Sequence, residues 1–374
     1  MAALANGTLA NALDFDEGSH LPTHILPAAL AVAEEQCLSG RDVLDAFIVG
    51  YEAGARVTQV IDARRRQQRG PTHQGWWHVG LVGPITAALT VCRLLKLDRS
   101  QAATAIGIAA CGCGGFRRNM GTMAKALHSG NAARLGVEAA SLAQSGFAAD
   151  REIIEAPLGF LEAVCPREDR DEAAITERLG RPYMLEAPLR IKQFPACNPG
   201  HPLIGAALRL CGQHVFSANE IELIEADLRT FSLLRPLPWD EISAGFSGAF
   251  LLAASLLQGT FGLDQLSEEM VHDPVIQALM KRVRHVPAGQ PEMLKLSLRG
   301  NRVVSIEVLP VRRLTTRDAV REKFRRCEER ALPPSSMELA EKQILRLEEQ
   351  CDVQFLMTAV GTPIEPTDFG LHAS

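Results

Sequence analysis

The sequence is poor in aromatic residues and has no excess of positive charge. Of its 374 residues only 5% are Phe, Trp or Tyr, and Tyr occurs just twice. Ala and Leu are abundant instead, a combination that favours helices packed closely through small side chains. Lys and Arg number 39 against 44 Asp and Glu, which gives a formal net charge of −5. Because nucleic acid attracts basic surfaces, we expect no nucleic acid partner.

Long apolar runs and paired cysteine motifs are also missing. The longest uncharged apolar run, 79–92, is too short to span a bilayer and predicts a buried helix. Nine cysteines are scattered along the chain without a CxxC motif, and we identify no signal peptide. We therefore expect a reduced, cytoplasmic setting and no membrane partner. The glycine-rich stretch 112–121 lacks a Walker or Rossmann pattern, which argues against a nucleotide.

What the sequence contains falls into two halves with different periodicity. In residues 1–182 apolar residues recur at helical spacing, which predicts an all-helical domain. The predicted helices are 25–37, 40–61, 83–95, 100–111 and 131–145. Asn131 is the predicted N-cap of the last helix, and glycines make the stretch before it a predicted loop that carries Lys125 and His128. The basic run 64–69 is predicted to be a solvated loop.

Residues 183–330 are predicted to form a smaller α+β domain. Alternating apolar residues predict strands at 189–194 and 221–230. Two further alternating runs, 294–298 and 304–308, predict a hairpin with a two-residue turn at Gly300-Asn301. The predicted helices of this domain are 201–212, 249–258 and 274–283.

Residues 331–374 are predicted to close the chain with one amphipathic helix. Ser335 and Glu338 fit a capping box, and apolar residues from Met337 to Cys351 follow helical spacing. Because such a helix has to cover an apolar surface, we expect this segment to pack back on the helical domain.

The sequence is organised around a polar stretch, 14–24, that lies between two apolar segments. It reads DFDEGSHLPTH and holds three carboxylates and two imidazoles within eleven residues. Gly18 and Pro22 interrupt any continuous helix, so the stretch predicts a helix end, a polar turn and a helix start. Polar loops between buried elements often carry chemistry. An exposed acidic loop without a function is the simpler alternative, and composition alone leaves it open.

Four polar positions stand out against apolar surroundings as candidates for chemistry. They are Asp14 with His20 and His24, His78 beside Trp77, Lys125 with His128, and His201 in the stretch FPACNPGHP at 194–202. If these side chains converge, they suit proton abstraction next to a carboxylate. The cations would bind the substrate anion and acidify its α-hydrogen, and a neutral imidazole or a carboxylate would take the proton.

Each candidate also has a purely structural explanation. His24 could be a core histidine or a helix cap, and a lysine such as Lys125 is most often solvated. A metal hydrolase built on Asp14, Asp16, His20 and His24 is a further hypothesis. No HExxH motif or other ordered ligand spacing supports it, so we expect no metal.

Four motifs resemble the MmgE/PrpD family, whose members include 2-methylcitrate dehydratase, cis-aconitate decarboxylase and an iminodisuccinate epimerase. The motifs lie at 6–24 with its DFD sequence, at 50–56 (GYEAGAR), at 121–133 (GTMAKALHSGNAA) and at 194–202. The resemblance implies a large helical domain, a smaller α+β lid domain and a cleft between them that binds a di- or tricarboxylate. It also implies a homodimer that works without a metal or an organic cofactor.

The resemblance implies roles for individual residues as well. Asp14, His24, Lys125 and His201 match the catalytic positions of the decarboxylase. The residues that we expect to bind substrate are His20, His78, His128 and Phe250. The expected activity is proton abstraction beside a carboxylate, by a lyase of the dehydratase or decarboxylase type or by an isomerase that epimerises its substrate.

Several positions depart from the family pattern. The lid motif RFSxxY is GFSGAF here, so Gly245 and Phe250 replace an arginine and a tyrosine. Trp77 stands where the family has a histidine, with His78 displaced by one, and Gly18 replaces a polar threonine. The sequence also begins almost at the DFD motif, without several N-terminal helices usual in the family. These departures favour an altered substrate or an epimerase, and they also support a family member that only binds or plays a structural role.

Overall fold

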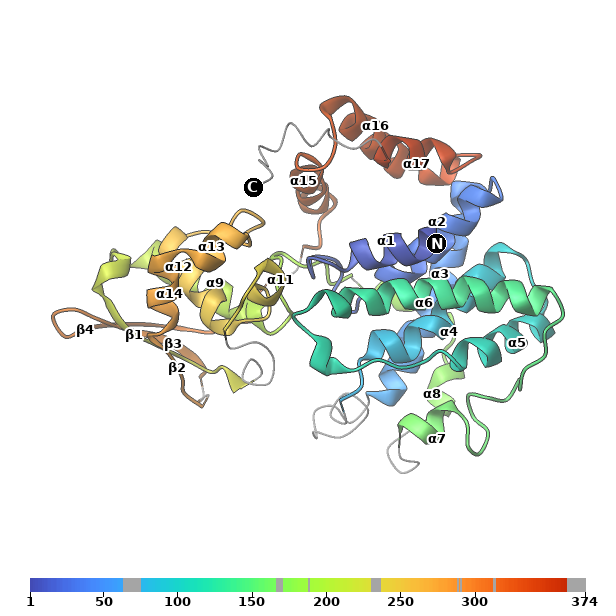
Figure 1. The fold of residues 1–374 in the computed structure, drawn as a ribbon, viewed down its shortest axis with the longest axis horizontal. Helices are drawn as coiled ribbons and strands as arrows, with labels where there is room; N and C mark the ends of the chain where they lie inside the picture. Colours follow the sequence, from blue (N-terminus) through green and yellow to red (C-terminus); the bar gives the residue numbers. More distant parts are fainter. Residues whose placement is uncertain are drawn as a thin grey trace.

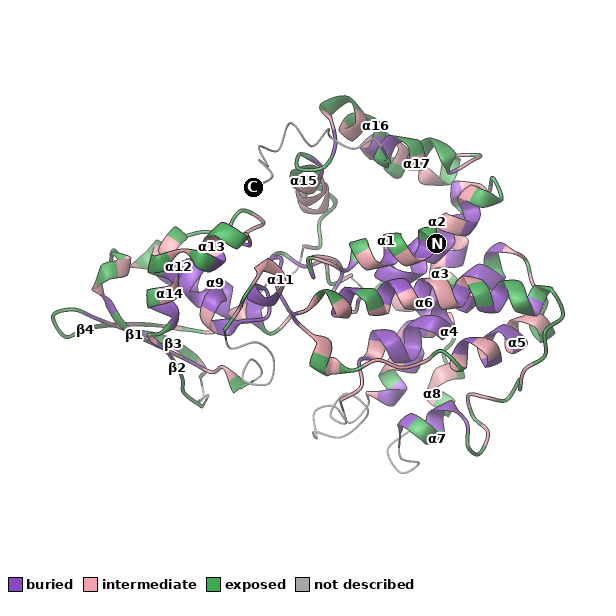
Figure 2. Ribbon diagram, viewed as in Figure 1, coloured by how far each residue is buried: buried purple, intermediate pink, exposed green. Residues whose placement is uncertain are grey.

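Two bodies and a C-terminal arm make up the fold (Figure 1). The computed structural model describes residues 1–62, 75–165, 171–187, 189–229, 237–287, 289, 291–311 and 314–361. The predicted basic loop 64–69 lies outside this part of the chain. Figure 2 shows that buried residues concentrate inside the two bodies, whereas the arm is mostly exposed or half-buried.

The first body is helical. Its long helices are α1 (Ala2–Ala10), α2 (Pro22–Glu35), α3 (Gly40–Ile61), α4 (His78–Leu94), α5 (Arg99–Ala110) and α6 (Met123–Gln144). The apolar helix α4 packs against α2, α3, α5 and α6. Small residues allow the close packing: a Cβ atom on Gly7 of α1 would lie 2.9 Å from the Cα of Gly130 in α6. This confirms the all-helical first half and the close packing expected from its composition.

One predicted boundary in this body is wrong, and the error concerns a candidate residue. Helix α6 begins at Met123, so Asn131 lies inside it and caps nothing. The start is set by Gly121, whose φ of +74° turns the chain just before the helix. Gly130 is tolerated within the helix because α1 approaches there. Lys125 therefore lies in the first turn of a long helix rather than in a loop.

The second body combines a sheet with helices. Its elements are α9 (Gly200–Gln213), β1 (Ile221–Ala226), α11 (Glu241–Ala244), α12 (Gly248–Gln258), α13 (Glu268–His272), α14 (Pro274–Met280), β2 (Val283–His285), β3 (Met293–Leu298) and β4 (Arg302–Glu307). The strand order is β2-β1-β3-β4, with β1 parallel to β2 and the other pairs antiparallel. Leu294, Leu296 and Leu298 of β3 point into a core that α9 and α12 share.

The structure corrects two strand predictions in this region. The hairpin is present, but Leu298 pairs with Arg302, so the turn contains three residues rather than two. The stretch 189–194 is not a strand: Ile191 forms isolated bridges with Glu17 and Leu314. The stretch therefore contacts two other segments of the chain and does not belong to the sheet.

Short elements lie between the longer ones, and further helices form the arm. The short elements are η2 (Arg117–Asn119), α7 (Phe160–Val164), α8 (Ala173–Thr176), η4 (Met184–Glu186) and η5 (Ala218–Glu220). The arm consists of α15 (Arg317–Glu328), α16 (Pro334–Leu345), η6 (Leu347–Glu349) and α17 (Gln354–Val360).

The prediction of a single closing helix is therefore wrong. Pro333 is the N-cap of α16 and no side chain caps the helix, so the expected capping box does not form. The arm does contact the helical body. The amide of Gly40 donates to the carbonyl of Gln350 (2.9 Å), and Val353 is fully buried against that body. The domain boundaries at 182 and 330 stay predictions.

Within the described residues, no helix is both long and apolar enough to cross a bilayer. The apolar run 79–92 forms most of α4 and is buried, as the sequence predicted.

Candidate active site

The polar stretch between α1 and α2 is a tight turn with unusual backbone angles. Asp14 and His20 have φ values of +51° and +63°, which residues other than glycine seldom adopt. Such conformations persist where the surrounding contacts fix them, and they gather at functional sites. Both side chains are buried, with 3% of each residue exposed. This excludes the exposed acidic loop that composition left open.

Two lysines bind the carboxylate of Asp14, one at each oxygen atom. Lys125 of α6 donates to Oδ1, and Lys192 from the segment between the bodies donates to Oδ2 (2.7 Å) and to the backbone carbonyl of Asp14 (2.8 Å). Burial raises the pKa of Asp14, but the ammonium groups of Lys125 and Lys192 and then His20 lower it more, so it stays far below its usual range. Asp14 is therefore an ionised carboxylate and a weak base.

Lys192 was missed by the sequence reasoning. It is fully buried, although lysine is among the residues least often found inside a protein. In the sequence it is one charged residue within an alternating apolar run, and that run suggested a strand whose polar side faces solvent. The useful signal was its place just before the FPAC motif.

His20 links the two aspartates of the DFD motif. Its Nδ1 lies 2.8 Å from Oδ2 of Asp16, and its Nε2 lies 3.5 Å from Oδ1 of Asp14. Burial raises the pKa of Asp16, whereas His20, its main favourable neighbour, holds it below the usual value. An ionised Asp16 accepts a hydrogen bond from Nδ1, which leaves Nε2 of His20 facing the Asp14 carboxylate.

A hydrogen-bonded polar chain supports this centre from within the helical body. The amide of Asn11 donates to Oγ1 of Thr23 (3.0 Å), which lies 2.9 Å from Oγ of Ser129. The side-chain oxygen of Asn11 accepts from Lys125. The lysine is therefore fixed by two acceptors, Asp14 and Asn11.

His24 lies in the first turn of α2 and is buried in the interior. Its Nε2 is 3.0 Å from Oγ1 of Thr86, whose hydroxyl donates to the carbonyl of Gly83. The imidazole therefore carries its proton on Nε2, and its buried Nδ1 makes no hydrogen bond within the described residues. Burial lowers the pKa of His24 to about 3, so the ring is neutral and a poor base. Its catalytic role stays a prediction.

Two further candidate histidines of the helical body lie on α4 and α6. His78 begins α4, donates from Nε2 to the carbonyl of Ser19 (3.0 Å) and stacks near His20, with ring centroids 6.2 Å apart. The indole of Trp77 lies 5.7 Å from the His20 ring. His128 follows Lys125 by one turn, and burial and then Lys125 lower its pKa. The expected roles of His78 and His128 in substrate binding stay predictions.

The α+β body places its two candidates differently. His201 is buried at the start of α9, donates from Nε2 to the carbonyl of Ala196 (3.2 Å) and packs on the ring of Phe194. Phe250 is fully buried in the apolar core of this body. The roles of His201 and Phe250 stay predictions.

Two other residues of the α+β body lie beside the centre. The ring centroid of Phe246 is 5.8 Å from Nζ of Lys125. Burial and then the negative charge of Asp14 raise the pKa of Cys197 to about 12, so its thiol is neutral. The amide of Cys197 donates to the carbonyl of Gly245 (3.0 Å), which joins the two segments. This body therefore presents an apolar ring and an uncharged thiol to the centre.

The same residues offer three ligand atoms for a cation. Atoms of Asp14, Asp16 and His20 lie within 4.8 Å of one another. However, both carboxylate oxygens of Asp14 already accept hydrogen bonds from ammonium groups. A bound metal ion would have to displace two buried lysines, and His24 does not belong to the group. The donor set therefore fits the metal hydrolase hypothesis poorly.

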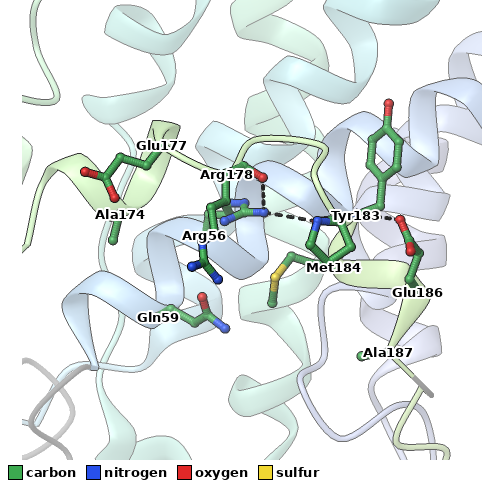
Figure 3. A pocket seen from close by; sticks show the side chains of 10 residues that line it. Arg56, Gln59, Ala174, Glu177, Arg178, Tyr183, Met184, Glu186 and Ala187 are labelled. Carbon is green, nitrogen blue, oxygen red and sulfur yellow. Dashed lines mark hydrogen bonds between the residues drawn. The ribbon is translucent and has the colours of Figure 1, made fainter.

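The GYEAGAR motif has a structural role. The Glu52 carboxylate accepts from Nε of Arg56 (2.7 Å) and from the amides of Gly180 (3.0 Å) and Met184 (2.6 Å). Arg56 in turn donates to the carbonyls of Arg178 and Pro182. The pair ties the segment leading towards Lys192 to α3, and a cavity of about 620 Å³ opens beside it (Figure 3).

The fold and the site define the class of protein: a helical body and an α+β body with a buried lysine–carboxylate–imidazole centre between them. Comparison with protein-family models identifies the family. The MmgE/PrpD N-terminal domain matches residues 1–173, and the MmgE/PrpD C-terminal domain matches residues 194–349. The chain belongs to the MmgE/PrpD family, which confirms the resemblance and the fold expected from it.

Curated relatives carry the name of one activity. The chain is 28% identical to the cis-aconitate decarboxylase of Mus musculus and 29% identical to that of Aspergillus terreus, over 78% and 75% of its length. It spans 62% of each of these relatives. A cis-aconitate decarboxylase-like protein of Aspergillus oryzae is 25% identical over 96% of the chain and 82% of its own length.

Proposed function

We propose that this protein is an enzyme that removes a proton next to a carboxylate of a small di- or tricarboxylate. The observation that carries the proposal is the buried Asp14 carboxylate held between Lys125 and Lys192, with His20 beside it. The names of the relatives support a carboxylate substrate and a lyase. We also propose a homodimer that needs neither a metal nor an organic cofactor, and a reduced, cytoplasmic setting.

The lysines supply the electrostatic part of the mechanism. A substrate carboxylate beside two fixed ammonium groups has its negative charge stabilised, and the charge that builds up as the α-proton leaves is stabilised further. Lys125 already donates to Asn11 and Asp14, whereas Lys192 has two described acceptor atoms for its three N–H donors. Lys192 is therefore the better placed of the two to bind the substrate.

His20 is the base that the geometry supports best. When the imidazole is neutral, Asp16 accepts from Nδ1 and Nε2 carries the lone pair that can take a proton. Asp14 is too acidic to take the proton, and its role is to fix both lysines and His20. When Nε2 takes the α-proton, the electron pair of the broken C–H bond moves into the adjacent carboxylate.

Two reactions can follow from this intermediate. Expulsion of a β-hydroxyl group as water gives dehydration, and return of a proton to the opposite face gives epimerisation. Decarboxylation is a third reaction and needs no proton removed first: the C–C bond to a carboxylate breaks, CO₂ leaves, and a protonated His20 gives its proton to the carbon. The absence of a side chain at Gly245 and the missing hydroxyl at Phe250 favour an altered substrate or an epimerase over the reactions of the named relatives.

The second candidate is a binding or structural subunit that has lost catalysis. The observation in its favour is that Gly245 and Phe250 replace the arginine and the tyrosine of the lid motif, with Phe250 wholly inside the core. This candidate predicts that a carboxylate binds to the Asp14 centre without any reaction.

An NMR screen separates the two candidates. The protein is incubated with citrate, methylcitrate, cis-aconitate and iminodisuccinate-type acids, and product formation is followed. We expect turnover of at least one acid, lost in Lys125→Ala and His20→Ala but kept in Lys295→Ala, which removes only a surface ion pair with Glu225. Tight binding without turnover of any acid would favour the subunit. Activity that disappears on chelation and returns with a divalent ion would favour the metal hydrolase.

A further inference from the structure

A lysine of the C-terminal arm reaches the backbone behind the Asp14 centre. Nζ of Lys323, in the middle of α15, donates to the carbonyls of Phe15 and Lys192, the latter at 2.9 Å. The same ammonium group lies 3.8 Å from the centroid of the Phe15 ring. Phe15 follows Asp14 directly, and Lys192 is the partner of Asp14. Lys323 therefore joins the main chain on both sides of the buried ion pair.

Other backbone contacts hold the same segments together. The amide of Gly18 donates to the carbonyl of Arg190 (2.9 Å), and the amide of Lys192 donates to the carbonyl of Asp16 (3.1 Å). Leu314, just before α15, donates to the carbonyl of Ile191 (3.3 Å). The turn between α1 and α2, the segment around Lys192 and the entry to α15 thus form one small assembly.

The charges of α15 show that Lys323 differs from its neighbours. Arg326 pairs with Glu322 on the same helix, and its side chain is 73% exposed. Arg325 pairs with Glu341 of α16, also near the surface. The ammonium group of Lys323 instead points inward, towards two carbonyls and an aromatic face. Carbonyl oxygens accept hydrogen bonds from an ammonium group, and an aromatic face attracts its positive charge.

We propose that Lys323 is a positioning residue of the Asp14 centre, through which α15 sets the alignment of Lys192 with Asp14. The proposal rests on the proposed function only for its effect on turnover. Lys323 touches neither the Asp14 carboxylate nor the imidazole of His20, so it acts through the backbone of Phe15 and Lys192. A small displacement of that backbone moves Nζ of Lys192, and misplacement by about 1 Å can cost roughly a hundredfold in rate.

The test uses the full chain and three variants. Lys323→Met removes the ammonium group and keeps the length of the side chain. Lys323→Arg keeps a donor that can reach both carbonyls. Arg326→Met is the matched control, because it removes a positive charge from the same helix without touching the assembly.

Two measurements decide the outcome. Hydrogen exchange at the amides of Gly18 and Lys192 should be at least about tenfold faster in Lys323→Met and near the wild-type rate in Lys323→Arg and Arg326→Met. For an acid that the enzyme turns over, kcat should fall about tenfold or more in Lys323→Met with KM changed less than about threefold, and Lys323→Arg should recover most of it.

Wild-type exchange and wild-type kcat in Lys323→Met would overturn the proposal. Equal losses in Lys323→Met and Arg326→Met would overturn it too, because they would indicate a general effect of charge on α15. If the wild type turns over no acid, the proposed function fails, and amide exchange alone then decides whether Lys323 positions the segment.

Discussion

The two bodies bury polar groups in different ways. The helical body buries a connected set of charged and polar side chains, from Asn11 and Thr23 through Lys125 to Asp14 and His20. The α+β body has an apolar core, and its buried His201 bonds to the main chain. The charged groups that we propose for catalysis therefore lie in the helical body and at Lys192.

The largest effect should come from removing the carboxylate that both lysines share. In Asp14→Ala two ammonium groups lose their buried counter-charge, so we expect the free energy of unfolding to fall by about 3–5 kcal/mol. Glu225→Ala removes the surface pair with Lys295 and should cost less than about 1 kcal/mol. Urea unfolding of both variants checks this, and equal losses would show that the Asp14 centre is not specially stabilised.

Catalysis should depend more on the imidazole of the helical body than on that of the α+β body. His20→Ala should lower kcat by about a hundredfold or more, as expected for a general base. His201→Ala should lower it less, because Nε2 of His201 donates to the carbonyl of Ala196 and offers no lone pair to a substrate proton. Steady-state rates with the best acid provide the comparison. A larger loss for His201→Ala would move the acid–base chemistry to the lid.

Phe250→Tyr restores the family's tyrosine and tests whether the α+β body can contribute a polar group to the site. Phe250 is fully buried among apolar side chains, so Phe250→Tyr buries a hydroxyl group among them. We expect a loss of about 1–3 kcal/mol in unfolding free energy and no gain in turnover. A rise in kcat at unchanged stability would instead show that position 250 faces the substrate.

The smallest effect concerns the arm and depends on pH. Glu328 is 6% exposed and neither carboxylate oxygen forms a hydrogen bond within the described residues. Burial, and then the charge of Glu341, raise its pKa from 4.5 to about 7. The protonated group contributes its full stability below pH 4.5, and this is lost as pH rises through about 7.

The stability of the neutral variant Glu328→Gln, relative to that of the wild type, should therefore rise between pH 5 and pH 8. Thermal unfolding at the two pH values measures the difference, with Glu329→Gln on the exposed side of the same helix end as the control. The same difference at both pH values would contradict a raised pKa at Glu328.

Much of the fold could be predicted because local patterns agree with the tertiary structure. The helix 40–61 was predicted at its observed bounds, since a regular apolar stripe and a capping box at Ser39 and Asp42 define it. The start of α6 was not, because glycines at 121 and 130 suggested a loop, whereas Gly130 serves a close approach of α1. Helix packing of this kind has no local signature.

The candidate site was predictable in part for the same reason. Asp14, His20 and Lys125 lie in motifs with several polar residues, and the structure brings them into contact. Lys192 lies in an alternating run that also holds Arg190, and only tertiary structure joins it to Asp14. Lys323 lies in a charged helix that resembles a solvated one, and its inward direction becomes visible only in three dimensions.

Exchange of the substrate's α-hydrogen with solvent tests most directly whether the reaction takes place at the Asp14 centre. The acid with the highest turnover is incubated in D₂O with the wild type, with Lys192→Met and with Lys295→Met. We expect deuterium at the carbon next to a carboxylate with the wild type and with Lys295→Met, and a rate at least about a hundredfold lower with Lys192→Met. An unchanged rate with a folded Lys192→Met protein would contradict the account, because the proton would then be removed somewhere else.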